Sequence, residues 1–548
     1  MATPPPVGQQ ARTSAKETLT SIFIAFVMAF VFRGFVVEAF VIPTGSMAPT
    51  LMGAHVRTNN PETGYSWPVN YSTREANYSA ASGMPFSVQR DLYLEDPITR
   101  EKHHILRTPL RWGDRIFVMK YLVGVNNPSR WDCIVFKNPN DPPQSYIKRL
   151  IGLPGEQVAL VDGDVFTRTP KPDDPRVTSP WAFNDWKAAR KPDMAQRAMW
   201  QLVFDSQYSP LDPMRNGRRV FTTPWAGANE AGAPDGWTLN GNGVYDYKGS
   251  APTQLLWKSG ERAIDDWYAY DVENYRGPED GTFPVSDVRL SMGVQPAAPG
   301  LKVAAVLSAR GHNYRMEVDG TQVTVRLRPH QVDEAASAEP WTTLATGTLA
   351  APLAPGVVTN VEFWHVDQSV HVWINDVLVA QGEYDWTIAQ RLQNSVNLAL
   401  EDIEDNAKAL ANPRQYVRPQ VRWEFSGGAF TLRRVALWRD IFYQPDMYGL
   451  LTPTQEHPDF GKPNLATHPM SPLTLSAHQF FVCGDNSPAS LDARKWGPPH
   501  PWVAKIDDTM GVVHSDLVLG RAFFVYFPAP YRAYGLPVPD VGRMRWIW

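Results

Sequence analysis

Three separated segments carry residue types that could together cleave an amide bond. They are IPTGSM at 42–47, YIKRLIGLPGE at 146–156 and GDNSPASLDARKWG at 484–497. In the first, Pro43 and Gly45 bend the chain directly after a strand-like run and so would present Ser46 at the edge of a sheet. A serine acts as a nucleophile only if a base takes its proton and donors stabilise the oxyanion that forms. In the second segment, Lys148 is the candidate base.

Lysine is a weak base at neutral pH unless its surroundings change. With an ordinary pKa of about 10.4, only about one amine in a few thousand is neutral at pH 7. Burial among apolar side chains lowers the pKa of a lysine by up to roughly 3 to 5 units. The neighbours Ile147, Leu150 and Ile151 supply such surroundings, although any strand in a protein core has similar ones.

The three segments and two further stretches resemble the type I signal peptidases, the leader peptidase family. The matching stretches follow an apolar segment in a fixed order: IPTGSMAPTL (42–51), GDRIFVMK (113–120), DCIVFKNP (132–139), YIKRLIGLPGE (146–156) and GDNSPASLDARKWG (484–497). The resemblance covers about 1–55, 110–168 and 475–530. It implies a membrane-bound serine endopeptidase that removes signal peptides from exported preproteins through an acyl-enzyme intermediate.

By position, the resemblance places the nucleophile at Ser46 and the general base at Lys148. It gives Ser490 the role of the hydroxyl that hydrogen-bonds and orients the lysine. The oxyanion would be held by the backbone N–H of Ser46 and by the hydroxyl of Thr44, where the family more commonly has serine. Threonine keeps the hydroxyl donor and restricts its rotamer.

The same resemblance predicts a supporting set and two substrate pockets. Asp492 and Arg494 match an ion pair that holds the site together, with Asp485 nearby. Two shallow apolar pockets would admit small residues such as alanine at the first and third positions before the cut. Their predicted lining is Phe40, Ile42, Met47, Val135, Tyr146 and Ile147.

An apolar segment precedes the serine. Leu19–Val37 contains a single charge, Arg33, in nineteen residues, and a helix of that length is roughly 28 Å long, enough to cross a bilayer. A cleavable secretory signal shares these features, but no small-x-small cleavage site follows. We therefore expect a cytoplasmic tail at 1–17 and an uncleaved transmembrane helix at 18–37. The basic residues Arg12 and Lys16 before it favour a cytoplasmic N-terminus, which puts the rest of the chain on the outer face of the cytoplasmic membrane.

The remaining sequence predicts a mainly β protein. An antiparallel β catalytic domain would be formed by 38–168 and 475–548, with a hairpin around Asp162 and Gly163. Residues 53–110 read as an irregular surface excursion. The insertion at 169–474 repeats short alternating runs between turn signals, which indicates a β-sandwich at 280–440. In its strand rhythm this part resembles concanavalin-like or laminin-G-like jelly rolls.

Composition and motifs exclude several other functions. A net charge of -4 with a pI of about 6.3 provides no basic patch for nucleic acid. With two cysteines, Cys133 and Cys483, there is no disulfide framework or cysteine-based zinc site, although the sequence leaves open whether the two pair. No metal-binding or cofactor-binding motif occurs. His365 and His371 read as strand residues flanking a turn, and the acidic run EDIED at 401–405 as a solvated loop in preference to a cation site.

Two other readings remain open. The chain could be a membrane-tethered binding protein whose lectin-like sandwich is the working part and whose protease scaffold is inactive. A self-cleaving repressor with a Ser-Lys pair would share the chemistry but not the apolar N-terminal segment. Neither the preproteins that are cut nor a partner of the insertion can be named from the sequence.

Overall fold

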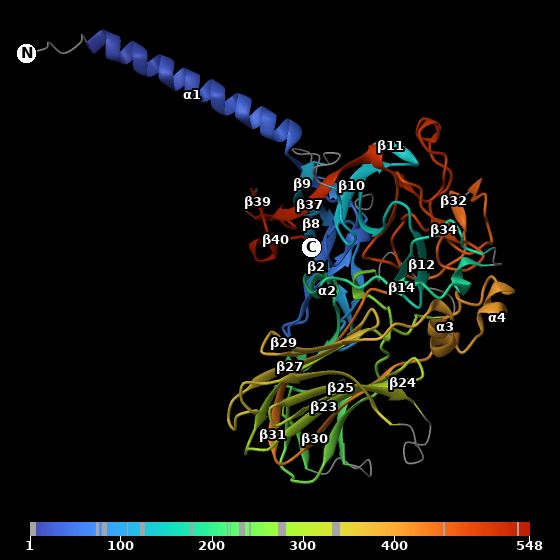
Figure 1. Cartoon of the computed structure of the whole chain (residues 1–548). Helices are drawn as coiled ribbons and strands as arrows, with labels where there is room; N and C mark the ends of the chain where they lie inside the picture. Colours follow the sequence, from blue (N-terminus) through green and yellow to red (C-terminus); the bar gives the residue numbers. More distant parts are fainter. Residues whose placement is uncertain are drawn as a thin grey trace, which may run out of the picture.

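The computed structural model shows a β-rich body from which one long helix projects (Figure 1). It describes residues 7–72, 76–78, 85–106, 108–120, 127–175, 179–215, 217–219, 221–229, 236–240, 243–271, 281–330, 340–452, 455–533 and 536–547. The first six residues of the predicted N-terminal tail therefore lie outside the described part.

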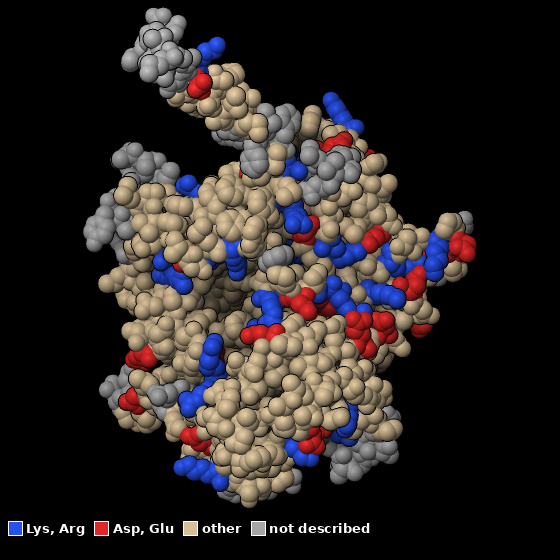
Figure 2. Space-filling view, turned by 60° about the vertical axis from the view of Figure 1, so that its left-hand side comes forward, with Lys and Arg blue, Asp and Glu red and all other residues tan. Residues whose placement is uncertain are grey.

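Helix α1 (Val7–Phe35) begins earlier and ends sooner than the predicted span at 18–37. It points away from the body, and the space-filling view shows a mostly uncharged surface along it (Figures 1 and 2). Several of its large apolar side chains are exposed: Leu19, Ile22, Phe23, Ile24, Phe26, Val27, Met28 and Phe30. Across the described residues, no helix combines the length and the hydropathy that a bilayer crossing requires, so the predicted transmembrane helix is not supported.

An antiparallel sheet carries the two segments around Ser46 and Lys148. Its order is β1-β9-β37-β10-β11-β35-β36, with β40 paired to β37. The strands are β1 (Val37–Val41), β9 (Arg115–Lys120), β37 (Val518–Phe527), β10 (Cys133–Asn138), β11 (Asp141–Gly152), β35 (Gln479–Cys483), β36 (Val513–His514) and β40 (Arg545–Trp546). Strands from both ends of the sequence thus interleave, as the prediction of a divided catalytic domain requires. Cys133 and Cys483 are buried free thiols on β10 and β35, on opposite sides of β11.

The predicted hairpin around Asp162 and Gly163 is present. Strands β12 (Gln157–Val161) and β13 (Asp164–Arg168) pair in register across it, and β14 (Lys187–Ala188) and β34 (Leu473–Thr474) extend the sheet. Both turn residues have positive φ (49° and 85°), the conformation that a two-residue hairpin turn of this kind requires. Alternate residues of β12 enter different cores, with Val158 and Leu160 on one side and Ala159 and Val161 on the other. This hairpin is therefore buried on both faces.

The prediction of an irregular excursion at 53–110 is wrong. A sheet of order β3-β2-β8 forms there, from β2 (His55–Asn59), β3 (Ser66–Asn70) and β8 (Leu110–Arg111). Val56, Trp67 and Val69 pack in a core of its own. Polar residues between these apolar positions obscured the short strands. Two hairpins complete the segment, β4 (Ala76–Tyr78) with β5 (Pro85–Val88), and β6 (Leu92–Glu95) with β7 (Lys102–Ile105).

Two antiparallel sheets form the sandwich at the bottom of Figure 1. The first has the order β19-β20-β31-β22-β27-β28-β29, with β15 paired to β31, and the second the order β18-β21-β30-β23-β24-β25-β26. The strands of the first are β15 (Gln201–Asp205), β19 (Trp237–Asn240), β20 (Val244–Tyr247), β22 (Val288–Pro296), β27 (Thr359–Val366), β28 (Ser369–Ile374), β29 (Val377–Glu383) and β31 (Phe430–Arg439). Those of the second are β18 (Trp225–Asn229), β21 (Thr253–Trp257), β23 (Lys302–Ala309), β24 (His312–Asp319), β25 (Gln322–Pro329), β26 (Thr342–Thr348) and β30 (Gln420–Ser426).

Because successive side chains of a strand point to opposite faces, alternate residues of the sandwich strands enter one core. Val303, Ala305 and Leu307 of β23 share this core with Tyr314 and Met316 of β24. Both sheets recruit strands from 201–257, so they use more of the chain than 280–440. His365 and His371 lie on β27 and β28 and flank the connecting turn, as predicted.

Helices are few and short outside α1. They are α2 (Asp193–Met199), α3 (Ile388–Val396) and α4 (Leu400–Glu404). The EDIED run lies largely on α4 and not in the predicted loop, because Ile403 anchors it by burying its side chain. The other described strands are β16 (Met214–Arg215), β17 (Arg218–Arg219), β32 (Leu450–Thr452), β33 (Gln455–Glu456), β38 (Tyr531–Ala533) and β39 (Leu536–Val538).

Buried charges join the hairpin of β12 and β13 to the sandwich. The Asp162 carboxylate accepts hydrogen bonds from Arg310 (2.7 Å), Arg391 (2.9 Å) and the Ser395 hydroxyl (2.7 Å). Arg310 lies in the β23–β24 turn, and Arg391 and Ser395 on α3. Four further buried aspartates nearby, Asp164, Asp287, Asp367 and Asp440, offer oxygens within 4.8 Å of one another. Lys191, Arg310 and Arg391 pair with these carboxylates and supply the positive charge.

Candidate active site

Ser46 lies on a tight loop that leaves the end of β1. A single 3₁₀ turn, Gly45–Met47, follows Thr44, and the N–H of Ala48 closes it on the Gly45 carbonyl at 3.0 Å. Met47 and Ala48 are completely buried, whereas Ser46 is half-buried. The loop is therefore anchored on both sides of a serine that keeps access to solvent.

Lys148 reaches the serine from β11. This strand pairs with β10 so that Lys148 lies opposite Ile134. The Lys148 Nζ atom is 2.7 Å from the Ser46 Oγ atom and 3.2 Å from the Ile147 carbonyl oxygen. At 2.7 Å an ammonium donates to the hydroxyl, and a neutral amine can accept the hydroxyl proton. The two predicted reacting groups, 102 residues apart in sequence, are thus in contact.

The surroundings of Lys148 favour its neutral form. The residue is 4% exposed, and burial lowers the pKa of its amine from 10.5 to about 8, because the ammonium loses its hydration. The negative charges of Asp492 and Asp485 act in the opposite direction and limit the shift. At pH 7 about one amine in ten is then neutral, several hundred times more than for an ordinary lysine.

The predicted oxyanion donor Thr44 and the predicted partner Ser490 occupy different settings. Thr44 is exposed at the start of the turn, and its side chain does not cap the turn. Ser490 is 2% exposed, and its hydroxyl makes no hydrogen bond with the described residues, so the predicted bond to Lys148 is not formed. The Lys148 amine is directed at Ser46 and the Ile147 carbonyl instead. The loop that carries Ser46, residues 42–52, is called the serine loop below. Gly484 allows Ser490 to lie close to this loop, since a Cβ atom added to Gly484 would lie 2.2 Å from the Ser490 hydroxyl and 2.4 Å from the Ser46 carbonyl oxygen.

Two buried ion pairs hold the strands behind the serine. Arg494 donates two hydrogen bonds, of 2.9 and 2.8 Å, to the Asp492 carboxylate, which also accepts one from the Gly484 N–H. Burial raises the pKa of Asp492, but Arg494 outweighs that effect and the net pKa is below its ordinary value. Asp485 forms a second two-bonded pair, with Arg149 at 2.7 and 2.6 Å. Sequence reasoning did not single out Arg149, although it directly follows Lys148 on the strand and must point to its other face.

A pocket of about 410 Å³ opens beside the serine and the lysine. Five of the six predicted specificity residues line it: Phe40, Ile42, Val135, Tyr146 and Ile147. The sixth, Met47, is 0% exposed and packs in the core beneath the pocket. Asn70, Gln144 and Leu491 also line it and were not predicted. The strand position of Gln144, two residues before Tyr146, was the available signal, because alternate residues share one face.

These features define the class of the site: a serine hydrolase centre in which a buried amine takes the place of the usual imidazole. The family description "Signal peptidase, peptidase S26" matches residues 15–67 and 97–198. Over these residues the chain is similar to the type I signal peptidase family.

Relatives carry the same family name. Signal peptidase I of Rickettsia prowazekii (strain Madrid E) is 29% identical over 158 residues, as is signal peptidase I of Rickettsia typhi (strain ATCC VR-144 / Wilmington). Each match covers 29% of this chain and 45% of the relative. The chain therefore spans less than half the length of these relatives.

Solved structures align with the chain at low scores. The carbohydrate binding module CBM66 from Bacillus subtilis gives a TM-score of 0.21 at 10% identity, covering 39% of this chain and 95% of the module. The laminarinase from Rhodothermus marinus gives 0.25 at 10% identity, covering 44% of this chain and 98% of the enzyme. Likenesses of this size support no conclusion about a ligand of the sandwich.

Proposed function

We propose that this protein is a serine endopeptidase that removes signal peptides from preproteins, with Ser46 as nucleophile and Lys148 as general base. The observation that carries the proposal is the 2.7 Å separation of the Lys148 Nζ and Ser46 Oγ atoms at a site where burial keeps the amine pKa near 8. The similarity to the signal peptidase family over the matched residues supports the choice of substrate.

In the first step, the neutral Lys148 amine accepts the Ser46 proton as the Oγ atom attacks the scissile carbonyl carbon. The resulting oxyanion is held by the Ser46 N–H and the Thr44 hydroxyl. When the carbon–nitrogen bond breaks, the Lys148 ammonium protonates the departing amine of the mature protein. The signal peptide is left as an ester on Ser46.

The second half repeats the proton transfer with water. Lys148, neutral again, takes a proton from a water molecule that attacks the ester carbonyl, and the ammonium then returns a proton to Ser46. Ser490, Asp492, Arg494 and Asp485 support this cycle without reacting, through the packing and ion pairs around Gly484 and Arg149.

The pocket accounts for a preference for small side chains near the cut. Phe40, Ile42, Val135, Tyr146 and Ile147 supply its apolar lining and leave a confined volume. A small side chain such as that of alanine fits and loses water, whereas a larger one meets the walls. Met47, buried below, shapes the floor and does not contact the substrate.

We also propose that α1 holds the protein at a lipid bilayer, with the catalytic body on the outer face of the cytoplasmic membrane. Its exposed phenylalanine and leucine side chains lie on a helix that points away from the body (Figure 1). Burying such side chains in lipid is favourable by about 1.5 to 3 kcal/mol each. A single-pass topology with a cytoplasmic N-terminus is part of this proposal.

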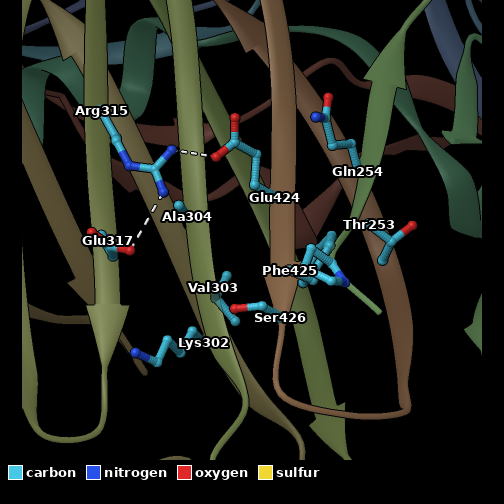
Figure 3. Close-up of a pocket in the computed structure, with 11 residues that line it drawn as sticks. Thr253, Gln254, Lys302, Val303, Ala304, Arg315, Glu317, Glu424, Phe425 and Ser426 are labelled. Carbon is cyan, nitrogen blue, oxygen red and sulfur yellow. Dashed lines mark hydrogen bonds and ion pairs between the residues drawn. The ribbon is translucent and has the colours of Figure 1, made fainter. Parts of the chain in front are cut away.

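The rival function, a binding protein that works through its sandwich, has less support. Figure 3 shows a hollow on the sandwich between β21, β30, β23 and β24. Its charged side chains are paired, because Arg315 forms ion pairs with Glu424 and Glu317, and Lys302 forms one with Asp319. The catalytic pocket instead contains a hydroxyl in contact with an amine of lowered pKa, Ser46 and Lys148, which is a pair that can react.

The test is cleavage of a preprotein with an Ala-x-Ala site by the full chain in detergent. Wild type should yield the mature product, and Ser46→Ala should yield none. Lys148→Met should lower kcat/KM by about 10²- to 10⁴-fold, the usual contribution of a general base. Lys137→Met, which removes a half-buried lysine from the neighbouring strand, is the matched control and should remain active. Cleavage that persists in Ser46→Ala would refute the proposal.

A further inference from the structure

The loop that carries Ser46 packs against a segment from the insertion. This segment includes a 3₁₀ turn, Ala269–Asp271, which lies in the sequence well beyond the residues that match the signal peptidase family. Tyr268 and Tyr270 share a buried apolar cluster with Ala48 and Met52 of the serine loop. The contact thus joins the reacting serine to a part of the chain that the family match does not include.

Gly45, the residue before the nucleophile, lies directly against the Tyr270 ring. A Cβ atom added to Gly45 would lie 2.5 Å from the ring atom Cε1 and 2.7 Å from the phenolic oxygen. Tyr270 is 1% exposed, so it cannot move aside into solvent. The ring therefore sets how far the serine loop can shift on this side.

A hydrogen-bonded chain runs from the same segment to the loop backbone. Asn486 donates one side-chain amide hydrogen to the Gly45 carbonyl (3.1 Å) and the other to the Asp271 carboxylate (2.8 Å). Its backbone N–H donates to the Ser46 carbonyl at 3.1 Å. Asn486 belongs to the GDNSPASLDARKWG segment, and without Asp271 its buried side-chain amide would keep only the hydrogen bond to the Gly45 carbonyl.

We infer that Asp271 is a positioning residue for Ser46, acting through Asn486, and that the insertion is consequently a part of the active site. The inference rests on the proposed protease function. It assigns to the insertion a role that a separate binding module would not have, because the inserted segment orients the side-chain amide of Asn486 that donates to the Gly45 carbonyl, while the backbone N–H of the same residue donates to the Ser46 carbonyl.

The cost of burying Asp271 supports this role. It is 3% exposed, and burial raises the pKa of its carboxyl to about 7, while the hydrogen bond from Asn486 and the charge of Arg439 act to lower it. A buried carboxyl with one good partner is unfavourable for folding compared with an apolar side chain. Its contact with Asn486 gives a reason for that cost.

Preprotein cleavage by three variants tests the inference. Asp271→Leu removes the acceptor, Asp271→Asn keeps an acceptor oxygen in the same place, and Asp96→Leu is the matched control. Asp96 is a fully buried aspartate in the turn between β6 and β7, and it accepts from the Asn60 amide at 2.7 Å and from the backbone N–H groups of Ile98 and Thr99. It serves an Asn–Asp pair of the same kind that does not reach the serine loop.

Asp271→Leu should lower kcat by about 10- to 100-fold, the effect of a misplacement of up to about 1 Å of a reacting group. KM should change little, because β1, β9, β10 and β11, which supply nine of the seventeen residues that line the pocket, are not held by Asp271. Asp271→Asn should restore most of kcat, and Asp96→Leu should keep wild-type kcat at whatever thermal stability it has. An equal loss of kcat in Asp271→Leu and Asp96→Leu would mean general destabilisation and would overturn the inference.

Hydrogen exchange separates this inference from the proposed function, because it needs no activity. In Asp271→Leu the amide of Asn486 and the amides of 45–52 should exchange faster than in wild type, with the sandwich strands unchanged. If wild type fails to cleave the preprotein, the protease proposal fails while the exchange result still decides the positioning role. Unchanged exchange in 45–52 and at Asn486 would refute it.

Discussion

At the scale of single residues, Lys148 gains its chemistry from where β11 places it. The strand buries the amine beside apolar side chains while Arg149, the next residue, points to the other face and pairs with Asp485. Of these two neighbouring residues, burial thus disfavours the charged form of Lys148, whereas the Asp485 carboxylate balances the charge of Arg149. The difference comes from their partners, since Lys148 contacts the neutral hydroxyl of Ser46 whereas Arg149 pairs with the carboxylate of Asp485.

The pKa of Lys148 predicts how cleavage depends on pH. Because burial lowers this pKa to about 8 and only the neutral amine is active, kcat/KM should rise about tenfold from pH 6 to 7 and about fivefold from pH 7 to 8, then level off above pH 9. Initial rates of preprotein cleavage at low substrate, measured in constant ionic strength, give the profile. A rate that is flat from pH 6 to 8, or that falls as pH rises there, would show that the base is not this amine.

The lowered pKa of Lys148 also predicts how the stability of the folded protein depends on pH. An unfolded chain holds the Lys148 proton up to about pH 10.5, whereas the folded chain releases it near pH 8. Between these values the unfolded state binds more protons, so this residue makes the folded state relatively more stable as pH rises. At neutral pH the burial of Lys148 therefore lowers the stability of the folded protein, and the same burial makes its amine usable as a base.

At the scale of elements, the packing of the body does not account for the apolar surface of α1. The described apolar side chains of α1 belong to no core cluster, whereas β12 is buried on both faces. An apolar helix that is left exposed is a membrane or partner contact in most proteins.

Removing three phenylalanines from α1 should release the protein from lipid. The combined variant Phe23→Ser, Phe26→Ser and Phe30→Ser replaces side chains that are 62% to 71% exposed, and vesicle binding should fall on the order of 100-fold or more. Flotation with phosphatidylcholine–phosphatidylglycerol vesicles measures it. As a control, serine at Leu450, Phe460 and Leu536, which are exposed on the body, should leave flotation intact. Equal flotation of both variants would count against the role of α1.

At the scale of the whole molecule, the catalytic body and the sandwich are held together by buried charge. Asp162, in the β12–β13 turn, accepts from Arg310 of the sandwich and from Arg391 and Ser395 of α3. Removing Asp162 takes one carboxylate partner from each of the two guanidinium groups, and breaking a buried pair costs about 3 to 5 kcal/mol.

Asp162→Ala should therefore weaken the junction more than either part. We expect wild type to unfold in one calorimetric transition and the variant to show two, with the sandwich and the catalytic body melting separately. Asp319→Ala is the control, because it removes an exposed pair with Lys302 that is worth about 0 to 1 kcal/mol. Two separate transitions already present in wild type would contradict the coupling.

The parts of the fold that could be predicted are those set by local pattern. The Asp162–Gly163 hairpin and the strand positions of His365 and His371 follow from alternation and turn residues. The sheet of β2, β3 and β8 was missed because its strands are short and interrupted by polar residues, and the helix at EDIED because a single apolar residue, Ile403, anchors it. In such segments tertiary burial decides the structure, and a local pattern cannot express it.

The residues of the candidate site also divide into those that the sequence could predict and those that it could not. Ser46, Lys148 and the pairing of Asp492 with Arg494 were predictable because each lies in a recognisable segment. Met47 was assigned to the pocket and is buried below it, since a one-residue rotation in a tight turn changes the face that a side chain occupies.

By itself, the sequence determined which groups could react and that most of the chain would form β structure, because residue type and alternation are properties of the chain. Only the tertiary structure decided that a lysine and a serine 102 residues apart would meet, and that Asp271, in an insertion, would face the serine loop. The physical reason is that contact between distant segments depends on the packing of whole sheets, and no local spacing records that packing.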